Sequence, residues 1–78
     1  MPVVITAKAL KDLKSVPARD VTAILAKLEI FAAHGTGDVK KLQSRDGYRL
    51  RHGDWRALFT MDADVVVIRV LHRREAYD

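Results

Sequence analysis

Two alternating stretches joined by a Gly-Asp pair constrain the fold of this chain more than any other feature. Apolar and polar side chains alternate in residues 48–52 and again in residues 55–61, which is the period of a strand with one buried face. Gly53 and Asp54 separate the two stretches, and glycine suits the first central position of a two-residue type II′ turn. The pattern predicts a β-hairpin with these opposite pairs: His52 and Trp55, Arg51 and Arg56, Leu50 and Ala57, Arg49 and Leu58, and Tyr48 and Phe59.

The N-terminal half predicts one strand and two helices. Val3 to Thr6 is short and β-branched, as expected of a first strand. Thr6 then caps a helix from about Ala7 to Lys14, with Leu10 and Leu13 on its buried side. A second helix runs from Pro17 to about His34. Its apolar residues follow the spacing of one buried helix face: Val21, Ile24, Leu25, Leu28 and Phe31.

The C-terminal half completes an α+β fold. Residues 65–71 form a nearly continuous apolar strand, which is typical of a central position in a sheet. We therefore expect one domain over residues 1–78, because a chain of this length supports a single core. It comprises an N-terminal strand, a two-helix hairpin and a three-stranded antiparallel meander, with the helices packed on one face of the sheet.

Composition and charge narrow the functional classes. The 78 residues contain no Cys, which excludes a disulfide framework, a thiolate zinc site and a cysteine nucleophile. No apolar run reaches the length of a signal peptide core or a membrane span, so we expect a soluble protein of the cytoplasm without membrane contact. The net charge of +4 is concentrated in residues 40–56 and 69–74, and such basic clusters favour polyanionic partners, above all nucleic acids.

The predicted hairpin places Arg49, Arg51 and Arg56 on the face that points away from the helices. An even-length turn before residue 65 would add Arg69, opposite Arg56, and Arg73. The same turn would place three apolar residues on the helix side: Val66, Ile68 and Val70. Like charges opposite one another destabilise a strand pair by up to about 1 kcal/mol, and no acidic residue within these strands compensates. We therefore predict a guanidinium cluster that binds an anion such as phosphate; the alternative is a set of arginines that are simply solvated.

Two segments resemble a known toxin family. The first comprises Lys41-Leu42 and residues 47–59, with the pattern Y-R-[LI]-R-x-G-[DN]-[YW]-R, and the second is the ending 70–77, with the pattern H-R-[RK]-x-x-Y. Together they resemble the RelE/ParE toxin superfamily, which implies a toxin of a type II toxin–antitoxin system. RelE-like members are ribosome-dependent endoribonucleases that cleave mRNA, whereas ParE-like members inhibit DNA gyrase. A non-catalytic nucleic-acid-binding module is a third alternative. The resemblance also implies a cognate antitoxin as partner, together with the ribosome and mRNA in the RelE-like case.

The RelE-like branch implies a role for individual residues. Cleavage proceeds by attack of a ribose 2′-OH on the adjacent phosphodiester, with no metal and no cofactor. We assign a catalytic role to Arg56, Arg73, Tyr77 and His72, and a substrate-binding role to Arg49, Arg51, Arg69 and Lys41. Arg69 is included because the predicted register places it on the arginine face. Because arginine stays protonated, the acid–base candidates are His72, Tyr77, His52 and Glu75. We favour His72 for proton transfer, although its register directs it toward the helix side, and Tyr77 for stacking or transition-state contacts. His52, beside the hairpin turn, is interpreted as a solvated turn residue.

Overall fold

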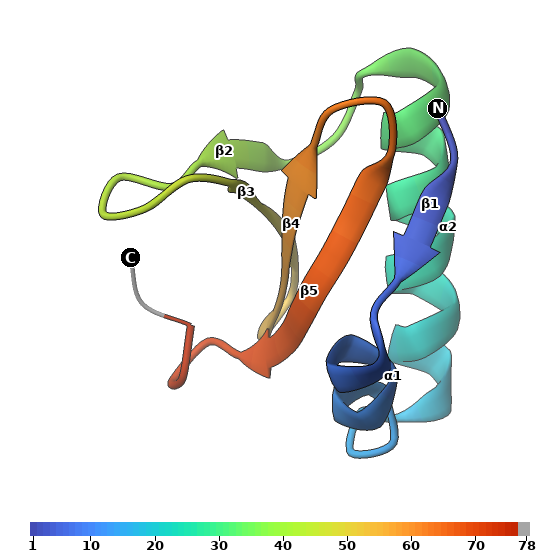
Figure 1. Ribbon diagram of the computed structural model, residues 1–78. Helices are drawn as coiled ribbons and strands as arrows, with labels where there is room; N and C mark the ends of the chain where they lie inside the picture. The colour runs from blue at the N-terminus through green and yellow to red at the C-terminus, as the bar shows by residue number, and fades with distance from the viewer. Residues whose placement is uncertain (77–78) are drawn as a thin grey trace.

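The computed structural model describes residues 1–76. The elements, in chain order, are β1 (Val3–Ile5), α1 (Ala7–Leu13), α2 (Ala18–His34), β2 (Val39–Lys41), β3 (Tyr48–His52), β4 (Trp55–Met61) and β5 (Val65–His72). The strands form one mixed sheet in the order β1-β5-β4-β3-β2, in which β1 runs parallel to β5 and the other neighbours pair antiparallel. Both helices lie on one side of this sheet, and no helix of residues 1–76 covers the other side, which we call the open face (Figure 1). The predicted α+β fold is confirmed, and strand β2 is an addition to it.

Helix α2 forms the main contact with the sheet. Ile24 and Leu28 are fully buried, and the other predicted face residues pack around them, so the predicted helix face is confirmed. Gly35 ends the helix in the left-handed conformation, at φ 73°, and its N–H donates to the carbonyl of Phe31 at 2.7 Å. Neither helix described here has the length and apolar character of a membrane span.

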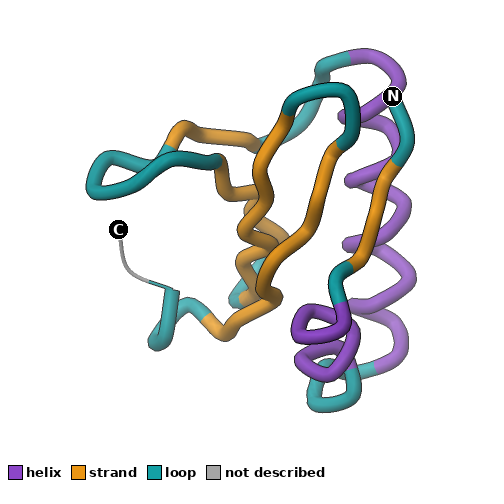
Figure 2. The backbone as a smooth tube through the Cα atoms, in the orientation of Figure 1, coloured by secondary structure: helices purple, strands orange, loops and turns teal. Residues whose placement is uncertain are grey.

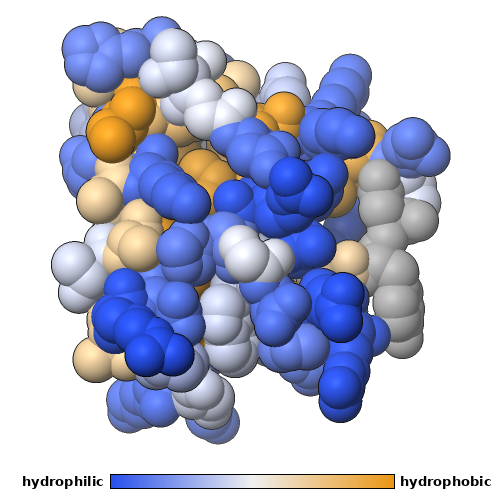
Figure 3. All heavy atoms as spheres, turned by 180° about the vertical axis from the view of Figure 1, so that it is seen from behind, coloured by the Kyte–Doolittle hydropathy of each residue, from blue (hydrophilic) through white to orange (hydrophobic). Residues whose placement is uncertain are grey.

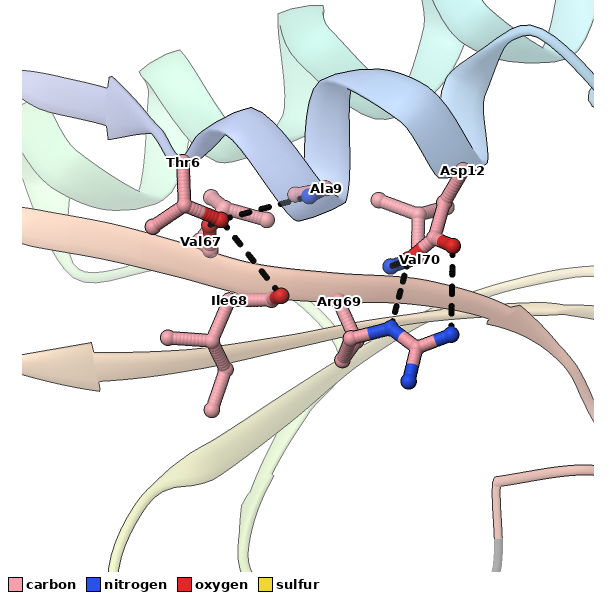
Figure 4. A network of polar contacts seen from close by, with 7 residues as sticks. All are labelled: Thr6, Ala9, Asp12, Val67, Ile68, Arg69 and Val70. Carbon is pink, nitrogen blue, oxygen red and sulfur yellow. Dashed lines mark hydrogen bonds and ion pairs between the residues drawn. The ribbon is translucent and has the colours of Figure 1, made fainter.

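Helix α1 packs along the edge of β5, where β1 is too short to cover it. The N-terminal strand β1 is short (Figure 2), and it pairs only with residues 65–67. Beyond that point the Asp12 carboxylate accepts from the backbone N–H of Val70 at 2.9 Å and from Arg69 Nε at 2.8 Å (Figure 4). Open strand edges otherwise expose unpaired donors, so α1 acts as a side-chain cap for β5. Its buried residues are Ala9 and Leu13; the prediction for Leu10 is wrong, since Leu10 is 57% exposed on the outer face.

The β3–β4 hairpin has the predicted register at all five pairs. Gly53 has φ 54°, and every positive φ within residues 1–76 belongs to a glycine, so the type II′ turn with Gly at its first central position fits. The aromatic residues of the hairpin enter the core. Phe59 is fully buried, and its ring lies 5.6 Å from that of Tyr48 and 5.5 Å from that of Phe31.

The register between β4 and β5 corrects two predictions. The turn is three residues long, so Met61 pairs with Val65, and the buried residues of β5 are Val65, Val67 and Val70. A β-bulge at Leu58/Phe59 then leaves one extra residue in β5, which restores the predicted inward position of Val70 but not those of Val66 and Ile68. For the same reason Arg69 lies opposite Leu58, and Arg56 lies opposite Leu71; the predicted Arg56–Arg69 pair is wrong.

Candidate anion-binding site

Four arginines from two hairpin strands and the end of β5 surround the open face of the sheet. We call Arg49, Arg51, Arg56 and Arg73 the arginine cluster. Arg51 lies directly opposite Arg56, as the alternation predicts. From behind, hydrophilic side chains gather over the centre and right of the molecule (Figure 3). Three of the four arginines also line a hollow of about 530 Å³, together with other residues: its lining comprises Lys27, Asp38, Arg51, Gly53, Asp54, Arg56 and Arg73.

Arg56 experiences the field of the other three guanidinium groups. Its pKa is lowered by partial burial and by repulsion from Arg49, Arg51 and Arg73. One terminal nitrogen, Nη1, donates to the carbonyls of Gly53 at 2.7 Å and Trp55 at 3.0 Å, which fixes the side chain against the hairpin turn. Within residues 1–76 no carboxylate forms an ion pair with Arg56. The side chain is therefore held in place while its positive charge is left without a direct counter-ion.

Arg49 has a buried donor without a hydrogen-bond partner among the described residues. Its side chain is 22% exposed, and its Nη1 is buried with no hydrogen-bond partner in the described part of the chain. The nearest carboxylate oxygen in an ion pair, Oδ1 of Asp38, is 3.9 Å away, which is too long for a hydrogen bond. Buried donors in folded proteins are normally paired, so this guanidinium nitrogen has hydrogen-bonding capacity that the described residues leave unused.

Two carboxylates from outside the strands partly compensate the cluster, which the sequence did not predict. Asp38, just before β2, accepts from Arg51 Nε at 2.6 Å, and this hydrogen bond lowers the pKa of Asp38. Asp54, in the hairpin turn, lies 3.4 Å from Arg73 Nε, and its carbonyl accepts from the Arg73 backbone N–H at 2.7 Å. Both carboxylates are more than 40% exposed, so these pairs are weak and exchangeable. Four guanidinium groups against two carboxylates leave an excess of positive charge.

The other predicted site residues lie elsewhere. Arg69 is on the open face, but its Nε and Nη2 donate to the two carboxylate oxygens of Asp12 in α1, so it does not join the cluster. His72 pairs with Trp55, their rings in edge contact at 5.4 Å, and its Nδ1 accepts from the backbone N–H of Arg74 at 3.3 Å. It therefore sits on the helix side of the sheet, as its register predicts. Tyr77 lies outside the described residues.

Strand β2 changes which lysine accompanies the arginines. Lys41 lies opposite Tyr48, a core-facing residue, whereas Lys40 lies opposite Arg49 and shares its face. Lys40 was missed because β2 was not predicted. Lys27 of α2 was also missed, although it lines the hollow. Within residues 1–76 no three His, Asp or Glu side chains come together in a way that could hold a metal ion.

The five-stranded mixed sheet with two helices on one face matches the fold of RelE toxins. The family model for the ParE toxin of the type II toxin–antitoxin system parDE matches residues 3–77, and the chain belongs to this toxin family. No curated protein matches the sequence.

Two solved structures resemble the chain closely in fold. One is the RelB–RelE antitoxin–toxin complex from Methanococcus jannaschii, with a TM-score of 0.78 and 26% identity over 92% of each chain. The other is the toxin–antitoxin complex RelBE2 from Mycobacterium tuberculosis, with a TM-score of 0.78 and 28% identity over 92% of this chain and 96% of that chain. Both are complexes with an antitoxin.

Proposed function

We propose that this toxin is an endoribonuclease that cleaves mRNA on the ribosome, with the arginine cluster holding the scissile phosphodiester. The observation that carries the proposal is the state of Arg56, which is fixed by two carbonyls, repelled by three guanidinium groups and not paired with a carboxylate of the described chain. A bound phosphate would remove this repulsion. Gyrase inhibition through protein contacts would need no such site.

The chemistry divides between charge stabilisation and proton transfer. The ribose 2′-oxygen attacks the adjacent phosphorus, the bond to the 5′-oxygen breaks, and the products are a 2′,3′-cyclic phosphate and a 5′-hydroxyl. Arg49, Arg51, Arg56 and Arg73 would stabilise the extra negative charge of the phosphorane as it forms. One proton must leave the 2′-hydroxyl and one must reach the 5′-oxygen, and arginine is unsuited to the first step because it stays protonated. His72 and Tyr77 are the candidates for these transfers.

Positioning of the mRNA must supply much of the rate enhancement of cleavage. The arginine cluster contains no group that readily accepts a proton, and His72 lies on the helix side of the sheet beside Trp55. In-line alignment of the 2′-oxygen, phosphorus and 5′-oxygen contributes a large part of the barrier reduction in such reactions. Alignment of the mRNA in the decoding site would provide it, which is why we assign the ribosome as a partner and the cytoplasm as the site of action.

A cognate antitoxin is the second partner that we propose. The two similar structures described above are both complexes with an antitoxin. We expect an acidic segment of the antitoxin to cover the open face, where the arginine cluster has an excess of positive charge over Asp38 and Asp54.

The second candidate function is inhibition of DNA gyrase. The match to the ParE toxin model over nearly the whole chain favours it. In this case the basic face would bind protein or DNA, and no RNA would be cleaved.

Primer extension on an mRNA with purified ribosomes separates the candidates. The toxin should produce cleavage within codons of ribosome-bound mRNA, and Arg56→Ala should reduce this cleavage by about a hundredfold, the effect of removing one donor to the transition-state charge. A parallel gyrase supercoiling assay tests the alternative. Inhibited supercoiling without RNA cleavage would establish the gyrase function. If the toxin neither cleaves RNA nor inhibits supercoiling, the non-catalytic nucleic-acid-binding module remains.

A further inference from the structure

A hydrogen-bonded chain joins α2 to the end of β3 at the rim of the hollow. Nζ of Lys27 is 2.8 Å from Nδ1 of His52, and Nε2 of His52 is 3.0 Å from Oδ1 of Asp20. Asp20 and Lys27 both belong to α2 and are two helical turns apart, so they flank one imidazole from the same face of the helix. The side chains of His52 and Asp20 are 20% and 23% exposed. The interpretation of His52 as a solvated turn residue is therefore wrong.

The partners determine where the imidazole proton resides. A lysine ammonium can only donate a hydrogen bond, so Nδ1 of His52 must accept. An ionised carboxylate can only accept, so Nε2 must donate to Asp20. Both contacts are satisfied together by the neutral imidazole with its proton on Nε2. The charged groups that face His52 in this arrangement are Lys27 and Asp20, both from α2, and its cross-strand neighbour Trp55 carries no charge.

The hydrogen bonds of Lys27, His52 and Asp20 place the Lys27 ammonium beside the arginine cluster. Lys27 lines the same hollow as Arg51, Arg56 and Arg73, but it reaches it from the helix layer. Its ammonium has three donors, of which only one is accepted within residues 1–76, by His52, so two remain there for another acceptor. No ion pair described for residues 1–76 involves Lys27, and its positive charge therefore adds to the excess in the hollow.

We propose that Lys27 is a further phosphate-binding residue and that His52, supported by Asp20, is the positioning residue that holds its ammonium at the hollow. The proposal rests on the proposed phosphodiester site and adds a cation from α2 to it. A lysine on a four-carbon stem loses considerable rotamer freedom when it binds an anion. Because His52 already orients the ammonium, much of that loss is incurred in the free toxin, which strengthens binding.

The test measures binding of a short 2′-O-methyl oligoribonucleotide, which cannot be cleaved because its 2′-oxygen is blocked. The affinity is obtained by titrating this oligonucleotide into the toxin and recording NMR spectra. Lys27→Met should weaken binding about tenfold, the effect of one charge-assisted hydrogen bond, and should lower the salt slope of log K by about 0.7. Lys27→Arg should keep most of the affinity. Lys11→Met, on the exposed part of α1 away from the hollow, removes the same charge and should bind as the unmodified toxin does.

Two substitutions of His52 separate positioning from general support of the fold. His52→Asn keeps an acceptor near the place of Nδ1 and should retain most of the affinity, whereas His52→Gln keeps only the contact toward Asp20 and should bind as weakly as Lys27→Met. Ring ¹⁵N shifts should show the neutral Nε2–H tautomer in the unmodified toxin and a loss of the Nδ1 contact in Lys27→Met. A protonated ring or an Nδ1–H tautomer at neutral pH would overturn the role of His52.

The outcomes also distinguish this inference from the function on which it rests. If Arg56→Ala weakens binding of the oligoribonucleotide and Lys27→Met does not, the phosphate site stands and Lys27 has no part in it. If neither variant weakens binding, the phosphate site itself is wrong. Weakened binding in both variants, with unchanged binding in Lys11→Met, supports both conclusions.

Discussion

Arg51 and Arg56 lie directly opposite each other on β3 and β4, and only one of them has a carboxylate partner within the described chain. Arg51 donates to Asp38 at 2.6 Å, whereas Arg56 is held by backbone carbonyls of the hairpin turn. Like-charged cross-strand pairs destabilise a sheet. A fold that keeps this pair at its open face stores repulsion that a bound anion relieves.

Inorganic phosphate should therefore stabilise the fold. A ligand that binds only the folded state at ten times its dissociation constant adds about 1.4 kcal/mol to the free energy of unfolding. For a domain of this size, each kcal/mol corresponds to about 4 to 8 °C in the melting temperature. Thermal unfolding in phosphate, compared with sodium chloride at equal ionic strength, measures the effect, and Arg56→Ala should abolish it. An equal shift in chloride would mean general screening rather than a site.

Arg56→Ala and Arg73→Ala should each relieve growth inhibition while the fold persists. Both guanidinium groups line the hollow, and neither is fully buried, so their removal leaves the core of Ile24, Leu28 and Phe59 intact. Growth on induction and circular dichroism of the purified variants are the measurements. Arg19→Ala, on the exposed first turn of α2, is the matched control and should remain toxic. Full toxicity of both cluster variants would remove these residues from the site.

The sequence predicted the hairpin well because its information is local. Alternation within residues 48–61 sets which side chains face the core, and Gly53 sets the turn, so the register follows. Strand β5 behaved differently. Residues 65–71 are apolar on both faces apart from Arg69, so the sequence does not show which of them face the core. Neither the three-residue turn nor the bulge at Leu58/Phe59 could therefore be predicted.

The arginines of the site were predicted, on the hairpin and, with Arg73, just after β5, whereas the charges that accompany them were not. The opposed arginines follow from the register. The other charges do not: Asp38 lies in the loop before β2, Lys40 in β2 and Lys27 in α2. Residues 39–41 contain one apolar residue, too little for a strand prediction, and the contact of α2 with His52 depends on how the helix packs on the sheet. Tertiary packing therefore decides which charges accompany the arginines.

Asp38→Asn should increase the affinity for phosphate. The Asp38 carboxylate binds Arg51 and lies near Arg49, so it competes with an anion for both groups. Because the hydrogen bond from Arg51 lowers its pKa, Asp38 stays charged at neutral pH, and substitution is the way to remove this competitor. We expect about two- to fivefold tighter phosphate binding by NMR titration, the range for an exposed pair. Asp62→Asn, in the β4–β5 turn, changes the net charge equally and should have no effect.

Asp12 should make the fold sensitive to acid. Burial alone would raise the pKa of Asp12, but the hydrogen bonds from Arg69 and the Val70 backbone N–H outweigh it, and the pKa is lowered overall. A carboxylate with a lowered folded-state pKa contributes stability that is fully present above its unfolded value, near 4, and is lost as the pH falls through the folded value. Denaturant unfolding between pH 2 and 7 should show the free energy of unfolding falling below pH 4.

Two substitutions apportion this effect. Asp12→Ala leaves the Val70 N–H and the Arg69 guanidinium without their acceptor and should lower the free energy of unfolding by about 1 to 3 kcal/mol at pH 7. Asp12→Asn keeps an oxygen that accepts from the Val70 N–H, and it should lower the free energy of unfolding by less than Asp12→Ala does. Because neither variant has a titrating group there, the difference in stability between each variant and the unmodified protein should shrink as the pH falls below 4. A difference that stays constant down to pH 2 would show that the carboxylate charge contributes nothing and that Asp12 acts only through contacts that do not need the charge.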